Sequence, residues 1–220
     1  MNSDRTSLSV LVRLVLVPAL ISLAVTVLRL AGELGDWSGS WFSKETGGTV
    51  PSGVGWVVGI TWLALPFGAW FGLRLRAIGK GPRSLTRSAM LAVLGVLVAY
   101  GGGFLIPRIG FPRVLIFIWF YMGVAAAVQY FGWPDLFRTL LLYGFAARIP
   151  VVIVMFFAMA YNWGTHYDYV GMPAQFSMDP VPRFLWLAFF PQLTFWVGYT
   201  VVMGTLGALI ALAVCRRRAS

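Results

Sequence analysis

The chain has 220 residues, of which 59% are hydrophobic and 11% charged, and its formal net charge is +10. A soluble domain has about 25% charged residues, so this chain carries too little charge to cover a water-exposed surface, and we expect a membrane protein. In a soluble protein, a net positive charge of this size suggests nucleic-acid binding. In a membrane protein, Lys and Arg are instead enriched in the cytoplasmic loops, so nucleic acid is not an expected partner.

Six apolar runs follow one another, and each reaches or approaches the roughly 20 residues that a helix needs to cross the hydrocarbon core. Backbone polar groups in lipid must be satisfied within their own segment, which favours helices. We therefore predict an all-α membrane protein in which residues 1–220 form a single domain, a bundle of about six transmembrane helices. The predicted helices span residues 8–30, 54–73, 88–106, 114–131, 136–161 and 184–214.

The first run resembles a secretory signal, because Arg5 and Arg13 precede and interrupt an apolar stretch. No convincing cleavage site with small residues follows before Trp37. We expect the run to be kept as a membrane helix.

The basic residues predict the orientation, because cytoplasmic loops are enriched in Lys and Arg. Both termini are then cytoplasmic, in a multi-pass protein of the cell inner (plasma) membrane, and the outer connections 31–53 and 162–183 are the long ones. The predicted inner side carries Arg5, Arg13, Arg74, Arg76, Lys80, Arg83, Arg87, Arg138, Arg216, Arg217 and Arg218. The predicted outer side carries Arg29, Lys44, Arg108, Arg113 and Arg183.

Small residues recur four positions apart in several runs, which lets helix backbones approach closely in a membrane. The spacing predicts a tightly packed bundle and indicates no chemistry. The pairs are Gly55 and Gly59, Gly68 and Gly72, Gly95 and Ala99, Gly123 and Ala127, and Gly204 and Ala208.

Arg148 lies inside the fifth run, ten residues after Arg138. At 1.5 Å per residue this is roughly 15 Å deep, where arginine is costly and must find acceptors in the bundle interior. The polar residues predicted at a similar depth are Thr61, Tyr100, Tyr121 and Gln192. No acid is predicted there, so this set can bind an anionic ligand. The alternative is that hydroxyls, carbonyls and water satisfy Arg148 structurally.

The single histidine, His166, precedes Asp168 by two positions in the second long outer connection. Glu33 and Asp36 are predicted on the same side of the membrane, so the four residues are candidates for a catalytic site. The alternative is that they are solvated or structural loop residues. We predict no metal site, because a metal needs three or four protein ligands and these lie in separate loops.

Other chemistry has little support in the sequence. The lone Cys215 cannot form an internal disulfide, and no common hydrolase or nucleotide-binding motif is present. We expect no cofactor and do not favour an enzyme.

Three functions remain open. The leading hypothesis is a protein that binds or transports a small amphipathic or anionic, lipid-like molecule at a midplane site around Arg148. The first alternative is an accessory or structural subunit of a larger membrane complex. The second is a membrane-embedded enzyme with an outer-face site at His166 and Asp168. The expected partners are membrane lipids, with a homo-oligomer or partner membrane subunits as further options.

Overall fold

The computed structural model describes residues 8–44, 55–105, 110–169 and 178–217, and within these ranges the chain forms helices and no strands. Helices long and apolar enough to cross a membrane make it a multi-pass membrane protein. In the described ranges there are five of these: Leu8–Leu34, Leu85–Phe104, Val114–Gly132, Pro134–Tyr161 and Pro180–Arg216.

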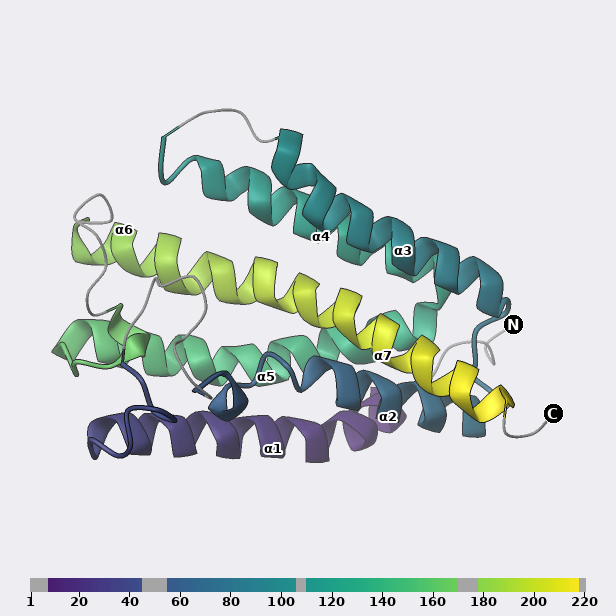
Figure 1. The fold of residues 1–220 in the computed structure, drawn as a ribbon, viewed down its shortest axis with the longest axis horizontal. Helices are drawn as coiled ribbons and strands as arrows, with labels where there is room; N and C mark the ends of the chain where they lie inside the picture. The colour runs from purple at the N-terminus through teal and green to yellow at the C-terminus, as the bar shows by residue number, and fades with distance from the viewer. Residues whose placement is uncertain (1–7, 45–54, 106–109, 170–177, 218–220) are drawn as a thin grey trace.

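Helix α7 (Val197–Arg217) lies at the centre of the bundle. It packs against α2 (Ala64–Ala77), α3 (Leu85–Gly101), α4 (Val114–Gly132) and α5 (Pro134–Tyr161), and α1 (Leu8–Leu34) packs against α5. Figure 1 shows α3 and α4 as an antiparallel pair on one side of α7, with α1, α2 and α5 on the other.

Helices α2 and α7 cross at close range, and glycines make this approach possible. A side chain at Gly68 would collide with the backbone of Gly204, and one at Gly207 would collide with the carbonyl of Leu65. One turn further on, Gly72 faces Ala208. Small residues on both helices therefore form this crossing.

The second predicted helix, 54–73, is wrong as a continuous span. Residue 54 lies outside the described residues, a 3₁₀ turn η1 covers Gly55–Val58, residues 59–63 are non-helical, and α2 follows. Glycine and β-branched residues dominate positions 55–61, and these have low helix propensity. Gly55 and Gly59 consequently share no helix. The 14 residues of α2 extend only about 21 Å, so α2 alone is too short to cross.

The last predicted helix, 184–214, is longer and less regular than expected. It begins as α6 (Pro180–Phe184), passes through two π-helical stretches, η5 (Leu185–Phe189) and η6 (Pro191–Trp196), and continues as α7. Pro191 has no N–H for the Leu187 carbonyl, its α-helical partner. The Tyr169 hydroxyl donates to that carbonyl at 2.6 Å.

The other predicted helices differ from the structure only at their ends. Ser84 caps α3 by accepting from the Arg87 amide, so α3 begins at Leu85 rather than 88. Residue 106, the predicted end of that helix, lies outside the described residues. Pro134 occupies the first turn of α5, a position where proline is favoured. The first helix extends to Leu34.

The bundle has two ends of different charge. The end on the right of Figure 1 holds the start of α1, the turn between α2 and α3, the turn between α4 and α5, and the end of α7. We call it the basic end, since Asp135 is the only acid among its described residues. Its described basic side chains are Arg13, Arg74, Arg76, Lys80, Arg83, Arg87, Arg138 and Arg216. The opposite, mixed end carries Arg29, Lys44, Arg113 and Arg183 with Glu33, Asp36, Asp168 and Asp179. Arg5, Arg108 and Arg218 lie outside the described residues.

Candidate functional site

Arg148 lies near the middle of α5, and only 5% of its surface is exposed. Its Nη1 donates to Oε1 of Gln192 at 3.2 Å, and its Nη2 donates to Oγ1 of Thr61 at 3.4 Å. The guanidinium carbon lies 4.9 Å from the centre of the Trp196 ring, within cation–π range. We call these four residues the Arg148 layer.

The layer coincides with both irregular stretches of backbone. Thr61 lies in the non-helical segment between η1 and α2, whereas Gln192 and Trp196 lie in the π-helix η6. Irregular backbone at membrane depth is tolerated where it is buried in protein or lines a cavity, and π-helical turns often occur at functional sites. Two departures from α-helix therefore meet at one buried cation.

The guanidinium is incompletely satisfied. Arginine has five N–H donors, and the Nε of Arg148 is buried without a hydrogen-bond partner among the described residues. None of the ion pairs in the same part of the chain includes Arg148. Its acceptors are neutral, and both hydrogen bonds are long. A buried cation without an anion is costly, so this arrangement favours an additional anionic acceptor.

Two of the residues predicted beside Arg148 lie elsewhere. Tyr100 is 65% exposed, and the ring of Tyr121 packs against Gly102 at the end of α3. The structure thus brings Gln192 and Thr61 to Arg148 and leaves the two tyrosines away from it. Sequence reasoning missed Trp196, although it follows Gln192 by four positions and therefore lies close to the same helix face.

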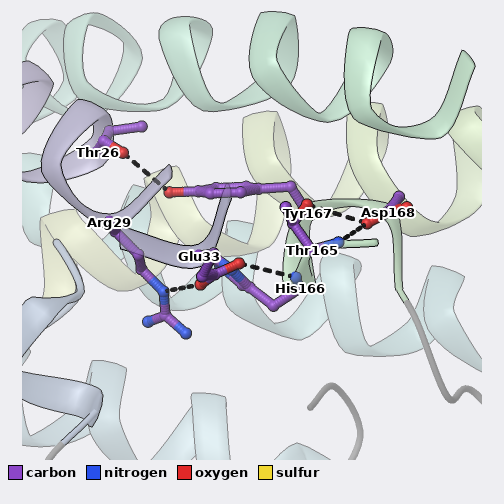
Figure 2. Close-up of polar contacts among 7 residues, drawn as sticks. All are labelled: Thr26, Arg29, Glu33, Thr165, His166, Tyr167 and Asp168. Carbon is purple, nitrogen blue, oxygen red and sulfur yellow. Dashed lines mark hydrogen bonds and ion pairs between the residues drawn. The ribbon is translucent and has the colours of Figure 1, made fainter. Parts of the chain in front are cut away.

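The predicted outer residues Glu33 and His166 meet at the mixed end (Figure 2). The Glu33 carboxylate is fully buried. Its Oε1 accepts from Nε of Arg29 at 2.9 Å and lies 2.5 Å from Nδ1 of His166. Its Oε2 accepts from the backbone N–H of His166 at 2.9 Å. The hydroxyl of Tyr167 donates to the Thr26 carbonyl at 3.3 Å, so a second bond links the same loop to α1.

Asp168 is occupied within its own turn. Its Oδ1 accepts from the backbone N–H and the hydroxyl of Thr165 at 2.6 and 2.9 Å, and its Oδ2 accepts from the Gly164 amide at 2.9 Å. The bond from the Thr165 amide is one half of a capping box around the 3₁₀ turn η3 (His166–Asp168), and the Asp168 amide donates to the Thr165 hydroxyl as the other half. Arg183 donates to the Asp168 carbonyl. The carboxylate orders the loop that presents His166.

Asp36 lies apart from this cluster. Its side chain is 79% exposed and pairs with Lys44. The structure therefore brings together three of the four predicted outer residues. No group of three potential metal ligands occurs in the described part of the chain.

The cluster has an electrostatic balance that favours a neutral imidazole. Burial lowers the pKa of His166, and the nearby Arg29 cation lowers it further, whereas the contact with Glu33 opposes both effects. A neutral imidazole beside a buried carboxylate can accept a proton. The Glu33 carboxylate, however, already accepts from Arg29 and from the backbone N–H of His166. Its contacts therefore link α1 to the loop after α5.

Comparison of the chain with known protein families, curated proteins and solved structures gives no match.

Proposed function

We propose that this protein binds, and in the membrane passes, a small amphipathic anion whose charged group is held by Arg148. The observation that carries the proposal is the buried Nε–H of Arg148, which has no acceptor among the described residues. A phosphate or carboxylate at this position would supply the missing acceptor and compensate the charge.

The interrupted helices support the same proposal. Transporter sites near the bilayer midplane are often formed by discontinuous helices whose ends meet the substrate. Here the segment before α2 and the π-helix η6 supply Thr61 and Gln192 to the cation. The positive end of the α2 dipole adds to the attraction for an anion. We also propose that the basic end faces the cytoplasm of a plasma membrane, following the positive-inside rule.

The test compares ligands that share a tail and differ in the head group. Purified full-length protein in mild detergent is titrated by calorimetry with dodecyl phosphate, dodecanoate and dodecanol. We expect the two anions to bind and the neutral alcohol to bind weakly. Replacing Arg148 with glutamine should weaken anion binding by about tenfold or more, because a hydrogen bond to a charged group contributes about 1.5–3 kcal/mol.

Arg148→Lys is the matched control, since it keeps the charge and loses the planar fork. It should retain part of the affinity that Arg148→Gln loses. Equal binding of dodecanol and dodecyl phosphate, or unchanged anion binding by a folded Arg148→Gln protein, would refute the proposal.

A further inference from the structure

A separate pocket opens at the basic end of the bundle. Its volume is about 290 Å³, close to the lower limit of roughly 300 Å³ for small-molecule sites. The last turn of α2, the following turn, the start of α3 and the end of α7 supply its walls. The lining residues are Arg76, Gly81, Pro82, Leu85, Leu212 and Arg216.

The wall between α2 and α3 is held in place from several directions. Gly79 has a φ of 74°, which few other residues adopt without strain. The Lys80 amide donates to the Leu75 carbonyl at 2.8 Å, which closes the helix end as a Schellman turn. The buried Trp133 then donates its indole N–H to the Lys80 carbonyl at 2.8 Å. Contacts within the fold therefore hold this wall of the pocket in place.

The charge of the pocket is one-sided. Its lining contains two arginines and no acid. Among the described residues, Arg76 and Arg216 belong to no ion pair. Leu85 and the buried Leu212 supply the apolar part of the lining. Two arginines beside apolar side chains match a phosphate head group joined to an acyl chain. A guanidinium binds phosphate oxygens through paired N–H donors.

We propose that this pocket binds a phosphate group through Arg76 and Arg216, either as the head group of an anionic lipid or as a soluble phosphate. The site is separate from the Arg148 layer and does not depend on it. Its position at the end of the bundle corresponds to the level of lipid head groups, where basic pockets between helices hold anionic lipids.

The test uses the full-length protein in mild detergent, with lipid binding measured by nondenaturing mass spectrometry. The probes are dioleoyl phosphatidylglycerol and the zwitterionic dioleoyl phosphatidylcholine. We expect the wild type to prefer phosphatidylglycerol. The double variant Arg76→Gln/Arg216→Gln should lose about tenfold in apparent affinity for it, with little change for phosphatidylcholine.

The matched control is Arg83→Gln/Arg87→Gln, which removes the same charge from the same end without touching the pocket lining. It should change the affinity less than twofold. A further variant, Gly81→Leu, keeps both arginines and fills the pocket, so it should also lose phosphatidylglycerol. Excess inorganic phosphate distinguishes a soluble phosphate from a lipid head group as the ligand. Displacement of phosphatidylglycerol by phosphate identifies a site for phosphate itself, and retention of the lipid identifies a lipid site.

Equal losses in the two double variants would mean that only overall surface charge matters, and would overturn the proposal. Unchanged phosphatidylglycerol binding by Arg76→Gln/Arg216→Gln or by Gly81→Leu would overturn it as well. Because Arg76 and Arg216 are exposed, their replacement should leave the elution volume and melting temperature of the protein unchanged.

Discussion

Replacing Glu33 with alanine removes the hydrogen-bond acceptor that joins the end of α1 to the loop after α5. The buried carboxylate accepts from Arg29 at 2.9 Å and from the backbone N–H of His166 at 2.9 Å, and it contacts the imidazole of His166. The alanine variant leaves the His166 amide and imidazole without this acceptor. We expect the loop 162–169 to detach from α1 before the rest of the bundle unfolds.

The magnitude follows from these contacts. Leaving a buried donor unsatisfied costs about 1–3 kcal/mol, and breaking a buried ion pair by removing one partner costs about 3–5 kcal/mol. Arg29 is 13% exposed at its side chain, so water recovers part of its loss. We therefore expect a loss of about 3 kcal/mol, which corresponds to a fall of roughly 6–12 °C in melting temperature for a chain of this size.

Two assays measure this change. Thermal unfolding in mild detergent gives the loss of stability, and hydrogen exchange of the peptide covering 162–169 gives the local opening. The amide of His166 should exchange faster in Glu33→Ala, because its acceptor is gone. Glu33→Gln should lie between the wild type and the alanine variant.

Asp36→Ala is the control, since Asp36 is exposed and pairs only with Lys44 among the described residues. It should change stability by less than about 0.5 kcal/mol. Hydrogen exchange of 162–169 that is identical in the wild type and Glu33→Ala would show that the cluster does not hold the loop.

The remaining predictions concern pH, packing and the polar bond between α1 and α5. Burial lowers the pKa of His166, so below about pH 6.5 the unfolded state binds more protons than the folded state. The melting temperature should therefore fall as the pH drops through that value. His166→Gln should remove this pH dependence. Gly68→Ile should break the crossing with Gly204 and lower the melting temperature or yield of folded protein. Gly123→Ala, where nothing lies within 4 Å, should stay neutral or gain up to about 1 kcal/mol. Tyr143→Phe removes the 2.8 Å bond to Ser22 and should cost about 1 kcal/mol in the same melting assay.

The sequence predicted the membrane class and most helix positions, because long apolar runs leave few alternatives. It missed the break before α2, since hydropathy reports burial in lipid and not helix continuity. The residues around Gly59 and Thr61 are apolar enough for a span, but their low helix propensity leaves them non-helical.

The sequence predicted how deep in the membrane the polar residues around Arg148 lie, but not which of them face it. Distance along a helix gives the level of Thr61, Gln192, Tyr100 and Tyr121 in the membrane. It does not give the side of the helix on which each lies, and the π-helical register near Gln192 rotates every residue after it. Tyr100 is exposed on α3 and Tyr121 packs against Gly102, whereas Trp196, within the π-helical stretch, reaches Arg148.

The cluster of Glu33 and His166 is formed by contacts between residues far apart in the sequence. Charge placed Glu33, Asp36 and His166 on one side, but the bond between Glu33 and the His166 amide joins residues 133 positions apart. The turn after α1, where Asp36 has a φ of 49°, separates it from Glu33. Sequence spacing contains no information about either arrangement.

The central claim is that the buried Nε–H of Arg148 is the donor for an anionic ligand. Nitrogen NMR of arginine-labelled protein observes this N–H directly, and the Arg148→Lys variant assigns its signal by removing it. We predict that dodecyl phosphate shifts the Arg148 Nε–H signal and that dodecanol leaves it in place. A signal that is unchanged by a saturating amount of dodecyl phosphate would contradict the account.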